Sequence, residues 1–372
     1  MIIGVPKEIK LQEHRIGLTP DSVKILTNKG HEVLVQDNGG FEAGFTNENY
    51  KNAGAKIIEK PEEIFKNSEI IVKVKEPLMS EVKMIRENQI IYTYLHLAAA
   101  KELTEGLIKT KSICIAYETV TDDNGRLPLL APMSAVAGRM SIQAGAHSLE
   151  KNQKGRGLLL GGAPGVEPAN VVILGGGVVG ENAAIIATGM KGKVYVVDKS
   201  KERLKELHEM FGDKIIPTQS DKTDLKKLVI DCDLLVGGVL IPGAEAPKLV
   251  TKEMIKSMKR GSVIVDVAID QGGCVETSKP TTHANPTYLV DDVVHYCVAN
   301  MPGGVPRTST MALNKATLPL LIKLADQGYK KTLQENKNYM AGLNVYKGKI
   351  TFKGVADAFN LNYTPAEKAL LK

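Results

Sequence analysis

Short apolar runs rich in β-branched residues alternate along the chain with stretches of helix length. This alternation is typical of parallel sheets whose strands are joined by crossover helices. The pattern begins with a strand over residues 2–5, a helix, and a strand over residues 32–35. Thr19 suits the cap of that helix, Pro20 its first position and Gly30 its end. We therefore predict an α/β fold.

Two series of this kind follow one another. In the first, further strands are expected over residues 69–74, 89–95 and 112–117. The sequence LPLLAPM, residues 127–133, interrupts the alternation, and residues 134–149 show helical spacing. After a glycine-rich loop over residues 155–165, strands are expected over residues 170–174, 193–197, 233–236, 262–267 and 295–298. We interpret residues 301–310 as a hinge, with helices expected over residues 311–327 and 331–343. A length of 372 residues also favours two domains, so we predict two doubly wound parallel sheets.

The sequence GGGVVG, residues 175–180, fits the dinucleotide-binding pattern G-x-G-x-x-G. The pattern alone is weak in a chain with 35 glycines, but a strand pattern precedes it and a helix pattern follows. Gly175 is expected to make the tight turn, Gly177 to let backbone N–H groups reach a pyrophosphate, and Gly180 to allow close helix packing. The alternative is a structural glycine turn.

An acidic residue follows at the position expected for ribose binding. Asp198 ends the next strand and lies 18 residues after Gly180, near the spacing of ~20 at which an acid binds the ribose hydroxyls. A carboxylate there repels a 2′-phosphate, so the sequence favours NAD over NADP. The cations Lys199, Lys201 and Arg203 lie nearby and weaken this preference.

Polar side chains follow several predicted strands, at the end where open parallel sheets bind ligands. Lys75 and His96 each follow a strand of the first series, and Arg15 lies in the loop after its first strand. Strands of the second series lead to Asp270 and Asn300. Each residue alone has an ordinary structural explanation, such as a solvated lysine, a core histidine, a surface ion pair or a turn cap. Their joint placement favours a functional cleft.

These residue types suit redox chemistry on a small amino or oxo acid. Arg15 can bind a carboxylate, and the ammonium of Lys75 can bind a carboxylate or polarise a carbonyl. His96 can pass protons near neutral pH while a hydride moves to a nicotinamide. Asp270 can orient or deprotonate a water molecule, or hold the substrate nitrogen.

Composition argues against several other classes of protein. Lys and Arg number 48 against 42 Asp and Glu, without a long run of like charge, and Trp is absent, so nucleic-acid binding gains little support. The cysteines at 114, 232, 274 and 297 and the seven histidines show no disulfide or metal-ligand spacing. A serine-hydrolase elbow and a P-loop are also missing. We expect a soluble cytoplasmic protein, because neither a signal peptide nor a membrane span is recognisable.

Taken in order, the sequence resembles the L-alanine dehydrogenase family. The similar stretches are the opening MIIGVPKEIKLQEHRIGLTP, VKVKEP around Lys75, YLHLA around His96, LAPMSAVAGRM, ILGGGVVG, VDVAIDQGG and VANMPGGVPRTST. The resemblance covers essentially the whole chain and implies NAD-dependent, reversible oxidative deamination of L-alanine to pyruvate and ammonia. Since a histidine must be neutral to accept a proton, activity should rise with pH through the usual histidine range.

The same resemblance implies roles for individual residues. His96 and Asp270 would be catalytic, and Arg15 and Lys75 would bind the substrate. Besides Gly175, Gly177 and Gly180, the residues implied to contact NAD are Ser134, Val178, Val179, Asp198, Arg203, Ser220, Val239, Leu240, Val267, Ala268, Ile269, Asp270, Val298, Ala299, Asn300 and Met301.

The family also implies a discontinuous substrate domain over residues 1–128 and 307–372, a NAD-binding Rossmann domain over residues 129–306, and a homohexamer. An alternative within the same family is the NAD-binding subunit of a proton-translocating transhydrogenase, which passes hydride to NADP on a membrane partner. The retained Lys75 and His96 argue against it. A catalytically silent NAD-binding protein is a third alternative, which the four residues assigned to substrate and catalysis disfavour.

Overall fold

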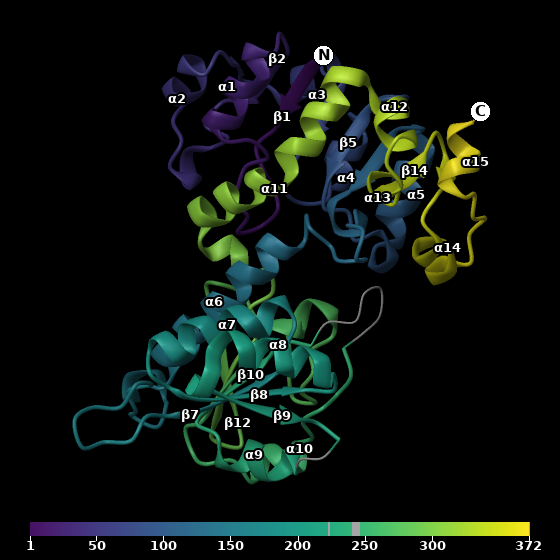
Figure 1. The fold of residues 1–372 in the computed structure, drawn as a ribbon. Helices are drawn as coiled ribbons and strands as arrows, with labels where there is room; N and C mark the ends of the chain where they lie inside the picture. Colours follow the sequence, from purple (N-terminus) through teal and green to yellow (C-terminus); the bar gives the residue numbers. More distant parts are fainter. Residues whose placement is uncertain (222–223, 240–245, 372) are drawn as a thin grey trace. The chain divides into compact units, whose positions relative to one another are not determined.

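The computed structural model describes residues 1–221, 224–239 and 246–371, and the chain divides into two compact units. Unit 1 comprises Met1–Met133 and Val305–Lys372, and unit 2 comprises Ser134–Gly304. The first boundary falls inside helix α6 (Ala131–Ser148), and the second immediately precedes helix α11 (Pro306–Gln327). In each unit, helices flank a central sheet (Figure 1).

Unit 1 contains an eight-stranded sheet with the order β15-β14-β6-β5-β4-β1-β2-β3. The strands are β1 (Ile2–Val5), β2 (Glu32–Gln36), β3 (Lys56–Ile58), β4 (Ile70–Val72), β5 (Ile90–Thr93), β6 (Ile113–Ala116), β14 (Leu343–Tyr346) and β15 (Lys349–Ile350). β1 to β6 are parallel, whereas β14 and β15 add an antiparallel edge. The chain order reverses between β1 and β4, and ligands bind at such a switch point in open α/β sheets.

Short helices and α11 surround this sheet. They are α1 (Pro20–Asn28), α2 (Asn47–Asn52), α3 (Pro61–Asn67), α4 (Met79–Val82), α5 (Lys101–Thr110), α12 (Tyr329–Gln334), α13 (Lys337–Met340), α14 (Lys353–Phe359) and α15 (Ala366–Leu370), with the 3-10 helices η1 (Phe41–Ala43), η2 (Leu97–Ala99) and η3 (Tyr117–Thr119). The start of α1 is as predicted, because the Thr19 side chain accepts a hydrogen bond from the Ser22 backbone and Pro20 opens the helix. Ile71, Ile91 and Cys114 of three neighbouring strands pack in one buried cluster of this unit.

Unit 2 contains a seven-stranded sheet with the order β12-β13-β11-β10-β7-β8-β9. The strands are β7 (Asn170–Leu174), β8 (Lys193–Asp198), β9 (Ile215–Gln219), β10 (Leu234–Gly237), β11 (Val263–Asp266), β12 (Thr287–Val290) and β13 (Val293–Tyr296), and only β12 among these is antiparallel to its neighbour. The six parallel strands have the Rossmann order, with the switch point between β7 and β10. The predicted α/β class with two doubly wound sheets is thus confirmed.

The elements that cover this sheet are α7 (Val178–Gly189), α8 (Lys201–Phe211), α9 (Leu225–Asp231) and α10 (Lys252–Lys256), with most of α6 and the 3-10 helices η4 (Lys151–Gln153), η5 (Gly212–Lys214), η6 (Val267–Gln271) and η7 (Met301–Gly304). Alanines 183, 184 and 187 of α7 pack against Val171 and Ile173 of β7 in a fully buried cluster. Small residues on this helix allow it to approach the strand that leads into the glycine turn.

Three expectations about elements are wrong. Residues 331–343 do not form one helix, because α12 ends at Gln334 and the Asn336 side chain caps the separate helix α13. The helix expected over residues 311–327 begins earlier, at Pro306, since proline suits the first position of a helix; the boundary between the two units nevertheless lies within the expected hinge over residues 301–310. The strand expected over residues 295–298 is β13, which begins and ends two residues earlier.

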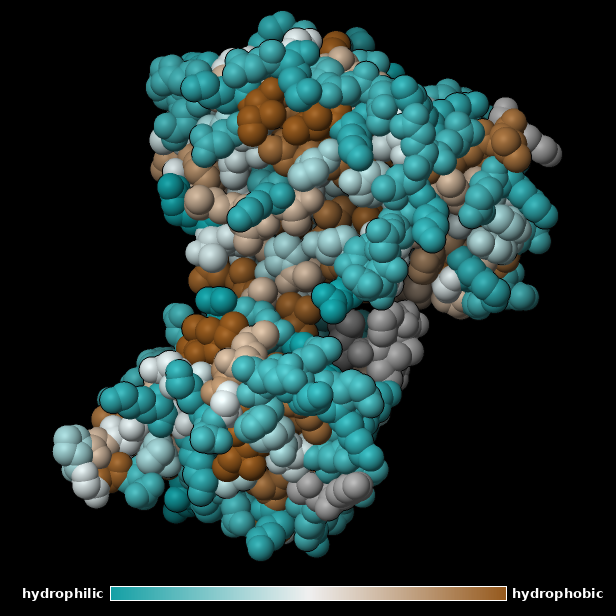
Figure 2. All heavy atoms as spheres, viewed as in Figure 1, coloured by the Kyte–Doolittle hydropathy of each residue, from teal (hydrophilic) through white to brown (hydrophobic). Residues whose placement is uncertain are grey.

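Polar side chains cover most of the face shown in Figure 2, and apolar side chains form separate patches on both units. Large apolar side chains with high exposure include Leu11 in unit 1 and Leu159 in unit 2. Of the helices in the described part of the chain, none combines the length and the apolar character needed to cross a bilayer.

Candidate functional site

Three of the predicted polar residues follow neighbouring parallel strands of unit 1. Arg15 lies in the loop after β1, Lys75 follows β4 and His96 follows β5, and the sheet order places β5, β4 and β1 side by side. The carboxyl ends of parallel strands meet at one edge of a sheet. The structure therefore brings these residues to the edge at the switch point of unit 1.

Arg15 is buried, with 2% of the residue exposed. Its Nε and Nη2 donate to the two carboxylate oxygens of Glu13 at 2.6 and 2.5 Å, and its Nη1 lies 3.0 Å from Sδ of Met133. Burial disfavours the charged form, but the hydrogen bonds and charge of Glu13 outweigh this effect and raise the pKa of Arg15. Asn314 of α11 fixes the same loop, since its side chain accepts from the Thr19 backbone at 2.8 Å.

Lys75 follows a buried charge cluster formed by Glu8, Lys73 and Glu81. The ammonium of Lys73 lies 2.9 Å from a carboxylate oxygen of Glu8 and 2.9 Å from one of Glu81, and each of these side chains is at most 4% exposed. The other oxygen of Glu8 accepts from the backbone N–H groups of Val74 at 2.6 Å and of Lys75 at 3.3 Å. Glu8 belongs to the loop after β1, so these hydrogen bonds fix the backbone at Lys75 against that loop.

His96 adopts a left-handed backbone conformation with φ 48° and ψ 38°. This region is uncommon for residues other than glycine, and such strain concentrates at functional sites. Glu118 stabilises it by accepting from the backbone N–H groups of His96 at 2.6 Å and of Leu95 at 3.2 Å, and it lies 4.0 Å from Nδ1 of the ring. The imidazole stacks at 5.8 Å on the ring of Tyr94, and its side chain is 47% exposed. The exposed imidazole is therefore carried by a turn that Glu118 fixes.

The glycine turn of unit 2 has the geometry that its sequence predicts. Gly175 has φ 95°, and a Cβ at Gly180 would lie 1.8 Å from the Gly175 carbonyl oxygen, so α7 approaches the turn as only glycine permits. A Cβ at Gly177 would meet no atom within 4 Å, and no side chain caps the helix at this residue. The turn therefore presents uncapped backbone N–H groups beside open space, and this arrangement fits a phosphate group.

Asp198 and Arg203 contact the same residue of this turn. The carboxylate of Asp198 accepts from the Gly176 backbone N–H at 2.6 Å, and Nε of Arg203 donates to the Gly176 carbonyl at 2.7 Å. Arg203 also contacts the carboxylates of Glu181 and Glu206. Burial disfavours its charged form, but hydrogen bonds and charges of these two glutamates outweigh that effect and raise the pKa of Arg203.

Asp270 and Asn300 come together at the carboxyl ends of β11 and β13. Asp270 lies exposed on η6, and its two carboxylate oxygens are 3.3 and 3.4 Å from the Asn300 backbone nitrogen, which donates to them. Asn300 has a left-handed φ of 59°. The buried Asp266 anchors the start of η6 by accepting from the Ala268 backbone at 3.1 Å, and burial raises the pKa of Asp266.

The remaining predicted residues are spread along the strand ends of unit 2. Ser134 lies one helical turn before Gly138 of α6. A Cβ at Gly138 would lie 2.2 Å from the Val179 carbonyl oxygen, so α6 contacts the glycine turn. Ser220 donates its backbone N–H to the Asp198 carbonyl at 3.0 Å. Val298 and Met301 belong to the buried cluster that contains Val171 and Ile173, and Val267 packs against it. Ile269 is buried, Ala299 is half-buried and Val178 is exposed. Val239 packs against a separate buried cluster of unit 2 that includes Val172 and Leu235. Leu240 lies outside the described residues.

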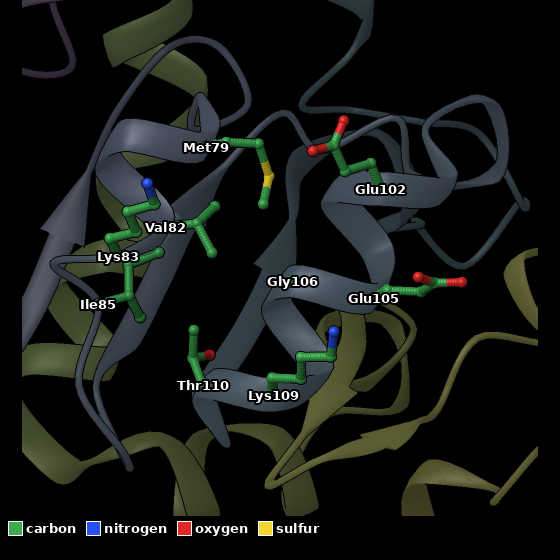
Figure 3. Close-up of a pocket in the computed structure, with 9 residues that line it drawn as sticks. All are labelled: Met79, Val82, Lys83, Ile85, Glu102, Glu105, Gly106, Lys109 and Thr110. Carbon is green, nitrogen blue, oxygen red and sulfur yellow. The ribbon is translucent and has the colours of Figure 1, made fainter.

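A shallow depression of about 430 Å³ lies elsewhere in unit 1, between α4 and α5 (Figure 3). Met79 and Val82 extend from α4 toward α5, and Lys83 and Glu105 are among the other lining residues. None of the predicted site residues that the structure describes lines this depression. In the described part of the chain, no three His, Cys, Asp or Glu side chains are grouped as a metal site would require.

Four acidic or cationic residues beside the predicted ones were not singled out from the sequence. They are Glu13, Glu118, Glu181 and Lys73. Lys73 alone had a readable signal, since a lysine inside the apolar run IIVKV must find a buried partner. Glu13, Glu118 and Glu181 form contacts that depend on the folded chain, and no rule of residue spacing in the sequence predicts them.

Comparisons with known proteins agree over the full length of the chain. Residues 4–137 match the family described as alanine dehydrogenase/PNT, N-terminal domain, and residues 141–353 match alanine dehydrogenase/PNT, C-terminal domain. The alanine dehydrogenase of Halomonas elongata is 54% identical over 366 residues, covering 98% of this chain and 99% of the relative. That of Methanococcus maripaludis is 54% identical over 371 residues, covering 100% of both.

Solved structures give the same result. A structure described as L-alanine dehydrogenase matches with a TM-score of 0.93 at 50% identity, covering 97% of this chain and 99% of the other. The transhydrogenase from Sinorhizobium meliloti matches with a TM-score of 0.82 at 22% identity, covering 94% of this chain and 100% of the other, and thus shares the fold. These matches confirm the resemblance predicted from the sequence, and the chain belongs to the alanine dehydrogenase/PNT family.

Proposed function

We propose that this chain catalyses the NAD-dependent, reversible oxidative deamination of L-alanine to pyruvate and ammonia. The observation that carries the proposal is the placement of Arg15, Lys75 and His96 after three neighbouring strands at the switch point of unit 1. Relatives named alanine dehydrogenase, 54% identical over essentially the whole chain, support the same activity.

We further propose that unit 2 binds NAD, and unit 1 the substrate. The open space at Gly177, the tight turn at Gly175 and the uncapped start of α7 fit a dinucleotide pyrophosphate. Asp198 at the end of β8 fits the ribose hydroxyls, and Ser134, Ser220, Val239 and the loops after β11 and β13 would complete the contacts. When bound, the nicotinamide supplies the acceptor for the hydride that leaves Cα of alanine.

Arg15 is proposed to bind the substrate carboxylate. Lys75 is proposed to bind that carboxylate or the carbonyl oxygen of the oxo acid. Glu13 balances the charge of Arg15 within the buried loop and fixes the plane of its guanidinium. Because Glu13 occupies Nε and Nη2, the substrate carboxylate would bind at Nη1 in place of the contact with Sδ of Met133. Lys75 extends from a backbone that Glu8 fixes, so its ammonium starts from a defined position.

His96 and Asp270 are proposed to move protons. Glu118 holds His96 on a strained turn with its imidazole exposed. This imidazole can accept a proton when the imine forms and when water attacks the imine. Asp270 on η6 can orient that water or hold the substrate nitrogen. The carbinolamine then releases ammonia.

A panel of small amino acids and oxo acids with NAD and NADP tests this proposal. L-alanine with NAD should raise the absorbance at 340 nm more than the other amino acids do, and pyruvate with ammonia and NADH should lower it. Hydride transfer from NADH to an NADP analogue that appears only when membranes carrying the NADP-binding partner are added, without amino-acid oxidation, would support the transhydrogenase alternative instead. Absence of any reaction in a protein that still binds NADH would support the catalytically silent alternative.

We also propose that the chain assembles as a homohexamer, as the family resemblance implies. Analytical ultracentrifugation of the purified protein should give a single species of about six times the chain mass of 40.2 kDa. A monomer at micromolar concentration would contradict this proposal.

A further inference from the structure

Each nitrogen of the Arg203 guanidinium contacts an oxygen atom of this chain. Its Nε donates to the Gly176 carbonyl at 2.7 Å, its Nη1 donates to Glu206 at 2.7 Å, and its Nη2 pairs closely with Glu181. Glu181 belongs to the first turn of α7, directly after the glycine turn, and Glu206 lies one turn further along α8. Two separate helices therefore contribute carboxylates to one cation.

This ion pair network lies where a dinucleotide's ribose is expected. A Cβ at Gly176 would lie 3.2 Å from the carboxylate of Asp198 and 3.4 Å from Cγ of Arg203, so both side chains border the same residue of the turn. In dinucleotide-binding folds the acid after the second strand binds the ribose hydroxyls, and an arginine nearby can accommodate the 2′-phosphate of NADP. Arg203 thus has the position of a cation that could bind this phosphate.

The surrounding charge argues against that use. Glu181 and Glu206 supply two carboxylates that contact the guanidinium, and the Asp198 carboxylate borders the same residue of the turn. A phosphate monoester would add about −1.5 to −2 charges at neutral pH. A 2′-phosphate would have to compete with Glu181 and Glu206 for the guanidinium and would lie near the carboxylate of Asp198. The side chains of Arg203 and Glu181 are 26% and 27% exposed, so water screens this pair only partly, whereas Glu206 is 54% exposed and its pair is screened more strongly.

We propose that Glu181 and Glu206 hold Arg203 away from a 2′-phosphate and so, together with Asp198, make this site selective for NAD over NADP. The inference rests on the proposed dinucleotide site of unit 2. It reverses the simple interpretation of Arg203 as a residue that favours NADP, because Glu206 and Glu181 pair with its Nη1 and Nη2.

Equilibrium binding of NADH and NADPH tests the inference without relying on catalysis. The fluorescence of each nucleotide is titrated with the parent protein and with Glu181→Gln, Glu206→Gln and the double variant; the chain contains no Trp, whose emission would overlap with nucleotide excitation. In the double variant we expect the ratio of the NADPH and NADH dissociation constants to fall about tenfold or more, mainly because NADPH binds more tightly. A change of this size is that expected for a charge-assisted contact between arginine and phosphate.

Two further variants identify the cause. Glu202→Gln removes one negative charge from the same helix, but the Glu202 carboxylate accepts from the Ser200 hydroxyl at 3.0 Å and does not contact Arg203, so the ratio should stay within about twofold of the parent. Adding Arg203→Met to the double variant should abolish the gain in NADPH affinity, because no guanidinium remains to bind the phosphate.

The possible failures are distinguishable. If the double variant binds NADH normally and keeps the parent's ratio, or if Glu202→Gln changes the ratio as much, the inference is overturned while the proposed function stands. If the folded parent protein binds neither nucleotide, the proposed function fails and takes the inference with it. Far-ultraviolet circular dichroism establishes that each variant is folded.

Discussion

The buried charge cluster of Glu8, Lys73 and Glu81 should be the most sensitive point of unit 1. Lys73→Met removes the only cation of this cluster and leaves two carboxylates whose side chains are at most 4% exposed. Removing one partner of a buried ion pair costs about 3–5 kcal/mol, because the remaining charge stays buried without compensation. We expect a loss of stability in this range.

The loss should be local as well as large. Hydrogen exchange measured by mass spectrometry should show faster exchange in peptides of β1, β4 and α4, whereas peptides of unit 2 should exchange as in the parent. Urea unfolding followed by circular dichroism should show an earlier first transition. Lys353→Met is the matched control, since Lys353 pairs with Asp357 at 2.6 Å but both side chains are more than 60% exposed, and such a pair contributes little.

The pH dependence of this effect has a definite sign. Burial disfavours the ammonium of Lys73, but the charges of Glu8 and Glu81 outweigh it and raise the pKa of Lys73 above its ordinary value of 10.5. Its contribution is therefore complete below pH 10.5 and is lost only as the pH rises through the raised pKa. The parent should therefore keep this contribution from neutral pH to about pH 9. In Lys73→Met the lowering effect of Lys73 on the pKa of Glu8 is lost and burial raises that pKa further, so the stability difference between the two proteins should grow as the pH rises.

Replacing all three charged residues separates the charge imbalance from lost packing. The triple variant with Lys73→Met, Glu8→Gln and Glu81→Gln leaves no buried charge, so it should be more stable than Lys73→Met alone. A Lys73→Met protein as stable as Lys353→Met would refute the reasoning, as would a loss of protection spread equally over both units.

Three further predictions concern the sites and the thiols. Glu118→Gln should lower kcat/KM for L-alanine about tenfold or more, mainly through kcat, because it weakens the contacts that hold the His96 turn; an unchanged kcat would show that Glu118 has no positioning role. Gly180→Ala should weaken NADH binding and destabilise unit 2 by about 1–3 kcal/mol, because the new Cβ would overlap the Gly175 carbonyl, whereas Gly189→Ala at the open end of the same helix should do neither. Burial raises the pKa of Cys114 and of Cys232 to about 12, so both thiols should react with Ellman's reagent at neutral pH only after unfolding, and rapid labelling of either in the native protein would contradict their burial.

Local rules predicted the parts of the fold that local chemistry determines. The glycine turn was predictable because each glycine has a steric task, and Gly175 and Gly180 show the positive φ and the close approach that those tasks require. The start of α1 was predictable because capping by Thr19 and the position of Pro20 depend only on neighbouring residues. The polar residues at strand ends were predictable because they follow the apolar strand patterns closely in the sequence.

Contacts between distant segments were not predictable in this way. The edge strand β14 begins at Leu343, the residue at which a helix was expected to end, and it forms by antiparallel pairing with β6, more than 200 residues away in the chain. The start of β13 was misplaced because Asp291 and Asp292 form the turn after β12 with φ values of 49° and 60°, and an Asp-Asp pair is an unusual choice for such a turn.

The environment of the candidate site residues was hidden for a similar reason. Arg15 lies in the polar stretch KLQEHR, which suggests a surface ion pair, yet the loop is buried under α11 and Arg15 pairs with Glu13 inside the protein. Burial of a polar loop depends on α11, which is almost 300 residues away in the chain, so the local sequence carries no signal for it. The assignment of individual catalytic and binding roles therefore stays a prediction.

The most direct test of the central claim follows the hydrogen at Cα of alanine. The protein is incubated with NAD and L-alanine that carries deuterium at Cα, and the reduced nucleotide is analysed by mass spectrometry. We predict that NADH forms with the deuterium bound to the nicotinamide and that pyruvate accumulates in equal amount. Pyruvate formed without deuterated NADH, or no reduction of NAD by a protein that binds it, would contradict hydride transfer from the amino acid.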